Sequence, residues 1–215
     1  MSRSGSPDNQ FVSLKGHTRV LTTVLSLVAL LSLASVVVSL AHGAFADGVV
    51  AGMVHWARPG VAIAAFLAFC VWVHRAHTNL KTLGAKKLWF SPASAVAWLL
   101  VPRLNYRMAP LVMMEIWTVS DPEFDPEHTD YPDWPWMRSS PLIWLWWVSL
   151  YLALACLVAS GTADGGIASI APVSPTRVGV AGDVLAVISC ISLMLVARAT
   201  QARQSQSAAS HNTTP

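Results

Sequence analysis

Two long apolar runs constrain this chain more than any other feature of its sequence. Residues 20–41 and 142–161 form runs of 22 and 20 residues without a charged side chain. A helix rises about 1.5 Å per residue and the hydrocarbon core of a bilayer is about 30 Å thick, so roughly 20 helical residues cross it. Each run therefore predicts a transmembrane helix. The composition agrees, because only 12% of the residues are charged, about half the share in soluble domains.

Two further apolar segments predict additional spans. The first, 59–78, ends in His74 and Arg75, whose long polar side chains can reach toward the headgroups. The second, 178–198, contains a single acidic residue, Asp183. Proline favours the first position of a helix, where its missing N–H costs nothing. Helices are accordingly expected to begin near Pro59, Pro92 and Pro141, and the four spans are placed at about 20–41, 59–78, 141–162 and 178–198.

The segment 91–120 is apolar but broken. Its first apolar stretch, 93–101, has nine residues and is followed by Pro102, Arg103 and Asn105. Nine helical residues rise only about 14 Å, roughly half the hydrocarbon thickness. The predicted fold is therefore an all-α, polytopic integral membrane protein with four transmembrane helices and a Pro-broken re-entrant or interfacial helical segment between spans two and three. A fifth crossing is the alternative.

The distribution of basic residues predicts the orientation. With four spans and both termini cytoplasmic, 12 of the 14 Lys and Arg residues lie inside, and only Arg58 and Arg177 lie outside. This distribution obeys the positive-inside rule, whereas a fifth crossing would export Arg198 and Arg203. The predicted location is the cell (plasma) membrane. Cleavage of a signal peptide after Ala46 is an alternative for the first span, but its apolar run is longer than the usual 7–15 residues.

The rest of the chain is expected to be less regular. A single membrane domain is predicted over 19–200, with disordered cytoplasmic tails at 1–18 and 201–215, because both tails are rich in small polar residues. The loop 121–138 is acidic and contains four prolines, which excludes a regular helix.

A set of residues around the broken segment carries a family resemblance. The chain resembles the bacterial membrane family catalogued as domain of unknown function 4328, and this resemblance implies a multi-span protein but assigns no chemistry. The residues that carry the resemblance include Trp72, Arg75, Asn79, Ser91, Pro92, Trp98, Pro102, Asn105, Glu115, Trp117, Asp121 and Pro122.

Polar residues within this region suggest a membrane-embedded cluster. Arg75 and Asn79 are four residues apart and share one helix face. Asn105, Glu115 and the backbone groups freed by Pro102 are expected to reach the same level, because polar groups at membrane depth seek partners. The structural interpretation, in which this network pins the broken segment to the spans, is favoured. The alternative is a ligand or ion site.

Other candidate sites are weaker. Arg58 and Asp183 are expected to form a charge pair near the outer interface. His74 and His77 stand three apart, but no third metal ligand is apparent, so neither a metal nor a cofactor is predicted. Lys and Arg are too dispersed to indicate a nucleic-acid partner.

The predicted function is therefore general. No residue pattern supports catalysis, and the favoured role is a non-enzymatic scaffold or regulatory membrane component. Its expected partners are the lipid bilayer, further copies of the chain or other membrane proteins. The alternative is binding or permeation of a small solute, ion or lipid at the broken-helix polar cluster.

Overall fold

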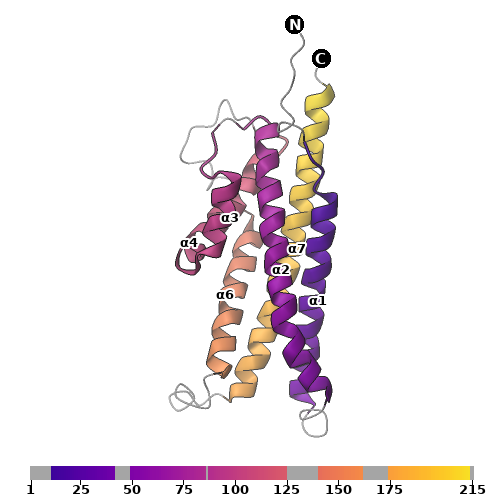
Figure 1. Ribbon diagram of the computed structural model, residues 1–215, viewed down its shortest axis with the longest axis vertical. Coiled ribbons are helices and arrows are strands. Elements are labelled where there is room, and N and C mark those ends of the chain that lie inside the picture. Colours follow the sequence, from indigo (N-terminus) through magenta and orange to yellow (C-terminus); the bar gives the residue numbers. More distant parts are fainter. Residues whose placement is uncertain (1–10, 42–48, 86, 125–139, 162–173, 214–215) are drawn as a thin grey trace. The chain divides into compact units, whose positions relative to one another are not determined.

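The chain is helical throughout its described part. The computed structural model describes residues 11–41, 49–85, 87–124, 140–161 and 174–213, and these residues contain no strand. The helices are α1 (Lys15–Leu40), α2 (Val49–Thr82), α3 (Pro92–Leu100), α4 (Pro102–Val119), α6 (Pro141–Gly161) and α7 (Pro175–Thr213) (Figure 1).

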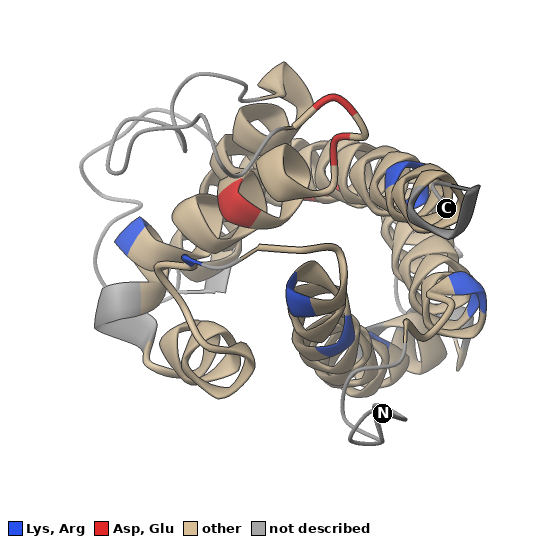
Figure 2. Cartoon of the chain, turned by 90° about the horizontal axis from the view of Figure 1, so that it is seen from above, with Lys and Arg blue, Asp and Glu red and all other residues tan. Residues whose placement is uncertain are grey.

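Four of these helices are long and apolar enough to cross a bilayer. They supply the segments Lys15–Leu40, Gly52–Thr82, Pro141–Ser160 and Thr176–Ser210. Among the described residues, α3 and α4 do not meet the same criteria of length and hydropathy. Figure 2 shows how few charged residues the helices carry. The predicted all-α fold with four candidate membrane-spanning helices is therefore confirmed.

The second span begins earlier than the sequence suggests. Helix α2 starts at Val49, and Pro59 lies inside it rather than at its first position, so that expectation is wrong. Proline inside a helix removes one backbone hydrogen bond. Membrane helices tolerate this loss because neighbouring helices can satisfy the freed carbonyl. Pro92 and Pro141, in contrast, do begin α3 and α6.

The predicted tails are partly helical. Helix α1 begins at Lys15, and Leu14 before it is buried. Helix α7 continues to Thr213 and buries Gln204 within the region expected to be disordered. The expectation took the small polar residues of this tail as a sign of disorder, whereas polar contacts described below hold the extension of α7 against other helices. Residues 1–10, the Ala46 site and most of the acidic loop lie outside the described residues.

The structure divides into two compact units where the sequence suggests one membrane domain. Unit 1 comprises 1–20, 68–143 and 196–215, and unit 2 comprises 21–67 and 144–195. Helices α1, α2, α6 and α7 each contribute residues to both units.

In unit 2, α6 and α7 approach closely at a glycine. A Cβ atom added to Gly182 would lie 2.9 Å from Cys156 Cβ and 3.4 Å from the Ala153 carbonyl oxygen. Farther along α7, the Ser189 hydroxyl donates to the Trp146 carbonyl over 3.2 Å. Small residues that let helix backbones come together are a common basis of packing between membrane helices.

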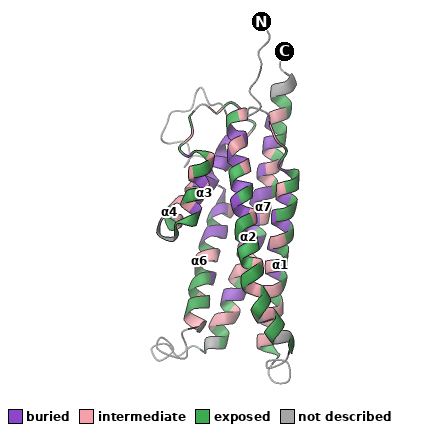
Figure 3. Ribbon diagram, in the orientation of Figure 1, coloured by how far each residue is buried: buried purple, intermediate pink, exposed green. Residues whose placement is uncertain are grey.

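Many outward positions of the long helices are apolar. Exposed residues recur along α1, α2 and α6, where Figure 3 draws them in green. Among them are Leu30, Val37, Ile63 and Leu157. Such a surface is typical of helices surrounded by lipid rather than by water.

In unit 1, α3 and α4 form a packed pair joined at Val101 (Figure 1). The start of α3 is fixed by Ser91, whose hydroxyl accepts from the Ser94 N–H while the Ser94 hydroxyl accepts from the Ser91 N–H. This reciprocal capping box satisfies two backbone donors that a helix start leaves unpaired. The predicted Pro-broken segment is therefore two short helices.

We predict that Gly182→Ala lowers the thermal unfolding midpoint of the full-length protein in detergent. The added methyl group would overlap Cys156 Cβ, and overpacking costs about 1–3 kcal/mol, which corresponds to about 2–12 °C for a chain of this size. Circular dichroism during heating measures the shift. Gly179→Ala is the matched control, because its Cβ would lie 4.0 Å from Ser160 Cβ and alanine favours a helix. Equal midpoints for the two variants would contradict the close approach.

Candidate functional site

Five of the buried polar residues that the structure describes in unit 1 form the main candidate site. Each side chain is at most 1% exposed, and the five are defined here as the buried polar cluster. Helix α2 supplies two members, α4 and its C-terminal end supply two more, and α7 supplies one. The cluster consists of His77, Asn79, Glu115, Ser120 and Gln204.

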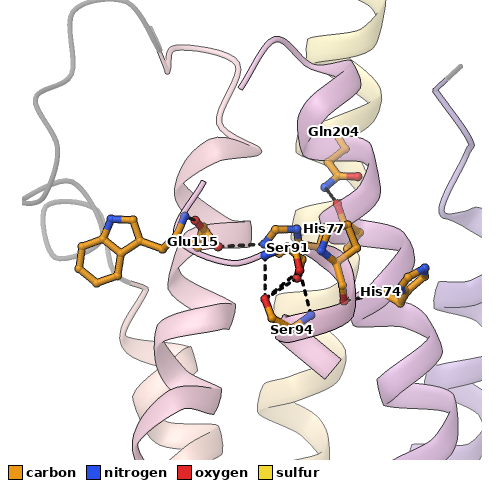
Figure 4. Close-up of polar contacts among 9 residues, drawn as sticks. His74, His77, Ser91, Ser94, Glu115 and Gln204 are labelled. Atoms are coloured by element: carbon orange, nitrogen blue, oxygen red, sulfur yellow. Dashed lines mark hydrogen bonds and ion pairs between the residues drawn. The ribbon is translucent and has the colours of Figure 1, made fainter. Parts of the chain in front are cut away.

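Glu115 is the charged centre of the cluster. Its Oε2 lies 2.9 Å from His77 Nε2, and its Oε1 accepts the Trp89 backbone N–H at 2.5 Å. Figure 4 shows the carboxylate facing the His77 ring across the space between α4 and α2. Since a carboxylate only accepts hydrogen bonds, His77 Nε2 carries the proton. Glu115 thus connects α4 to α2 and to the segment before α3.

Asn79 and Gln204 form the second part of the cluster. Asn79 Nδ2 donates to the Val12 carbonyl over 2.9 Å and to Gln204 Oε1 over 3.0 Å. Gln204 Nε2 donates to the Ala76 carbonyl at 3.1 Å and to Ser120 Oγ at 3.0 Å. These two amides therefore join α2, α7, the end of α4 and the segment before α1.

Arg203 reinforces the same contact between α7 and α4. Its guanidinium carbon lies 3.9 Å from the centre of the Trp117 ring, and Nη1 is 3.3 Å from the Trp117 carbonyl oxygen and 3.5 Å from Asp121 Oδ2. Cation–π stacking and a carboxylate partner both favour a planar guanidinium at this position.

The structure separates the residues that the sequence suggested would form one network. Asn79 and Glu115 are both buried in the cluster but have different partners. Asn105 Nδ2 instead donates to the Leu99 carbonyl at 2.9 Å, at the end of α3, and Pro102 begins α4. Within the described residues, no hydrogen bond joins Arg75 to Asn79, Asn105 or Glu115. The predicted four-residue network is replaced by three separate sets of contacts.

Sequence reasoning missed His77 and Gln204 as cluster members. His77 was weighed only as a metal ligand beside His74, yet His74 is exposed and contacts the Pro92 carbonyl oxygen at 3.4 Å. Leu80 and Val73, one turn away on either side of His77, are both buried, and this apolar helical spacing was the available signal. Gln204 gave no comparable signal, because its neighbours are polar or small.

The residues of the family resemblance mostly have structural contacts. Trp72 Nε1 donates to Thr18 Oγ1 over 3.0 Å, Ser91 and Pro92 form the start of α3, and Trp117 and Asp121 contact Arg203. Trp98 is half-buried and Pro122 is exposed.

Unit 2 contains a partly buried ion pair. Arg58 of α2 and Asp183 of α7 are paired, and Arg58 Nη1 also donates to Ser35 Oγ of α1 over 3.0 Å. The Asp183 side chain is 5% exposed and that of Arg58 is 33% exposed. A carboxylate at such a position needs a partner, because burial of an unpaired charge is costly.

The polar contacts at these sites are hydrogen bonds and ion pairs. The described residues contain no group of three or more His, Cys, Asp and Glu side chains that could hold a metal ion. The cysteines Cys70, Cys156 and Cys190 are free thiols. The polar side chains instead connect helices that lie far apart in the sequence.

Comparison with known proteins places the chain in a family. The model of the family described as domain of unknown function (DUF4328) matches residues 37–202. The chain belongs to this family. No curated protein and no solved structure matches the chain. The DUF4328 match covers every element from the end of α1 to the Thr200 turn of α7, and thus all the cluster residues except Gln204.

We predict that Arg58→Ala destabilises the protein more than Asp183→Ala does. Removal of Arg58 leaves a carboxylate buried without its partner, whereas the one-third exposed arginine can move its head toward water when Asp183 is removed. The unfolding midpoint should fall by about 6–20 °C for Arg58→Ala when measured by tryptophan fluorescence during heating.

The double variant Arg58→Ala/Asp183→Asn is the control for this interpretation. It removes the charge that Arg58→Ala leaves unpaired, so its midpoint should lie above that of Arg58→Ala alone. With Asp183→Asn measured as the matching single variant, a double variant whose midpoint falls by the sum of the Arg58→Ala and Asp183→Asn effects would count against the pair.

Proposed function

We propose that this DUF4328 protein is a non-enzymatic scaffold or regulatory component of the cell membrane. The proposal rests on one observation, which is that Glu115, Asn79 and Gln204 of the buried polar cluster are hydrogen-bonded to other parts of the same chain. Both oxygens of Glu115 and both amides of Asn79 and Gln204 are occupied by partners from the same chain. A side chain that binds a ligand would instead keep its polar atoms available, whereas these three side chains are engaged within the fold. His77 Nδ1 is the atom of the cluster that has no hydrogen-bond partner among the described residues.

The side-chain amides of Asn79 and Gln204 each have hydrogen-bond partners at both the nitrogen and the oxygen. Asn79 uses Nδ2 for two acceptors and receives the Val12 N–H at Oδ1 over 3.4 Å. Gln204 uses Nε2 for two acceptors and Oε1 for Asn79. Because buried polar groups must be satisfied in any folded protein, this arrangement supports a structural role.

The proposed location is the plasma membrane, with both termini in the cytoplasm. Support comes from the four apolar helices and from the excess of Lys and Arg in the segments that this orientation places inside. Among the described basic residues of unit 1 are Lys15, Arg19, Arg75, Lys81 and Arg107.

The proposed partners are the lipid bilayer and other membrane-embedded chains. The exposed leucine, valine and isoleucine side chains of α1, α2 and α6 are matched to an apolar environment. Lipid, a further copy of this chain and another membrane protein all provide such an environment. A scaffold must bind a protein, which is either a further copy of this chain or another membrane protein.

The alternative function is binding or permeation of a small solute, ion or lipid at the polar cluster that the sequence suggested around the broken segment, which includes Asn79, Asn105 and Glu115. It requires that the polar residues there contact the ligand. The test is therefore whether substitution of those residues lowers the stability of the fold or removes a bound molecule.

Asn79→Ala and Gln204→Ala distinguish the two functions. A structural role predicts that each variant lowers the unfolding midpoint by about 3–8 °C, because each leaves buried partners unpaired. Gln206→Ala, at an exposed position of α7, is the matched control and should leave the midpoint unchanged. Native mass spectrometry of the full chain in nanodiscs should show no small molecule that is bound by the parent and lost in the variants.

The opposite pattern would support the alternative. In that case Asn79→Ala and Gln204→Ala would unfold at the parent temperature and would lose a copurifying molecule. Crosslinking in native membranes tests the scaffold role itself and should yield a defined oligomer or complex. A chain that remains monomeric and uncrosslinked at native abundance would contradict that role.

A further inference from the structure

The joined end of α3 and α4 is apolar and exposed. Leu100, Val101 and Tyr106 are 57%, 43% and 65% exposed, respectively, and Figure 3 draws the exposed positions of the pair in green. Arg107, which follows Tyr106, is exposed as well. Nearer the other end of α4, residues 112–116 are buried throughout. We define the hairpin tip as Leu100, Val101, Tyr106 and Arg107.

Hydrogen bonds within the hairpin hold the tip in shape. Asn105 Nδ2 donates to the Leu99 carbonyl over 2.9 Å, and the Asn105 backbone N–H donates to the Val101 carbonyl over 2.8 Å. Both bonds connect the start of α4 to the end of α3. Arg107 lies eight residues before Glu115, which corresponds to about 12 Å along α4. The tip is therefore well separated from the buried carboxylate that anchors α4 to α2.

The tip points toward the apolar part of α2. Within unit 1, Figure 1 shows the joined end of α3 and α4 pointing back along α2, away from the end at which Thr82 lies. The exposed surface of α2 changes from polar to apolar in that direction. His74 and Lys81 are exposed polar residues, whereas Val71 is an exposed apolar one. The tip thus points from the basic end of α2 toward its membrane-spanning part.

The hairpin carries positive charge. Residues 86–120 contain four basic residues and a single acidic one, Glu115. Glu115 is buried and paired with His77, so it does not offset the exposed charge of Arg107. Within the described part of the chain, no ion pair joins Arg107 to a carboxylate. The tip therefore presents apolar side chains next to an arginine that has no acidic partner.

We propose that the hairpin tip inserts into the cytoplasmic leaflet and binds an anionic phospholipid there. Leu100 and Val101 lie among the acyl chains, Tyr106 lies at the headgroup level, and Arg107 binds the lipid phosphate. A guanidinium can form two parallel hydrogen bonds to a phosphate, and its long stem spans the distance between the acyl chains and the headgroups.

The charge of the hairpin favours lipid over a protein as the occupant. Apolar side chains beside exposed basic ones are typical of elements that lie in a lipid interface. The cytoplasmic leaflet contains anionic lipids, and each basic residue near its surface increases the affinity about fivefold. The inference rests on the proposed membrane location and orientation, but it does not depend on the scaffold role.

Fluorescence quenching in nanodiscs tests the insertion. A bimane label is attached at Leu100→Cys in the full chain, with the three native cysteines replaced by alanine. Brominated phospholipids should quench this label, and aqueous iodide should not. Labels at Val71→Cys and Gln206→Cys are the controls for lipid and water, respectively. Val71 is an exposed apolar position of α2, and Gln206 is an exposed position of the polar extension of α7.

A comparison of two brominated lipids tests the binding of the anionic headgroup. At equal mole fraction, phosphatidylglycerol should quench the Leu100 label more strongly than phosphatidylcholine. Arg107→Gln should reduce this preference about fivefold, whereas Arg107→Lys, which keeps the charge, should retain it. Lys81→Gln makes the same change of charge at an exposed position of α2 away from the tip, and it should leave the preference unchanged.

Three results would overturn the proposal. Quenching of the Leu100 label by iodide would place the tip in water, and protection from both quenchers would show that a protein covers it. Equal quenching by the two lipids in the parent protein would exclude recognition of the anionic headgroup. The Val71 label reports the membrane location independently, so a failure of the tip proposal is distinguishable from a failure of that location.

Discussion

The burial of the Glu115 carboxylate is the constraint on which the rest of unit 1 depends. At 1% exposure it cannot be hydrated, and an unpaired carboxylate in such surroundings is far more costly than any single apolar contact is favourable. His77 and the Trp89 backbone N–H meet this demand from two different parts of the chain. Their positions in turn set where α4 lies against α2 and where the segment before α3 runs. The two short helices are therefore held by directional contacts, which specify one arrangement better than apolar packing alone.

The two units use different means to hold their helices together. In unit 2 a glycine lets α7 approach α6, and one ion pair with a serine partner joins α1, α2 and α7. In unit 1 two side-chain amides and a stacked guanidinium join α7 to α2 and α4. Helices within a bilayer gain little from burying apolar surface against one another, because lipid is equally apolar. Close packing and polar contacts supply the specificity that the hydrophobic effect supplies in water.

The sequence predicted the coarse fold well because bilayer thickness translates directly into the length of an apolar run. The third span illustrates this, since its apolar run has the length of a crossing, and α6 begins at Pro141 as predicted. Pro59 misled the same reasoning, because a proline that begins a helix and one inside a membrane helix look alike in sequence. The pairing of Arg58 with Asp183 could be predicted from the sequence, because few charged residues lie in the spans and each needs a partner. The hydrogen-bond partners of Asn79 and Glu115 could not be predicted from the sequence. They depend on how each helix is rotated about its axis and on a C-terminal extension of α7 whose composition suggests disorder.

The central claim is that Glu115 holds α3 and α4 in place. Hydrogen–deuterium exchange of the Glu115→Leu variant, followed by mass spectrometry of peptides from the full chain in nanodiscs, measures this most directly. The account predicts faster exchange across α3, α4 and the segment that contains Trp89, with unchanged exchange in residues 144–161 and 174–195 of unit 2. Exchange of the α4 amides at the parent rate, or an equal increase in both units, would contradict it.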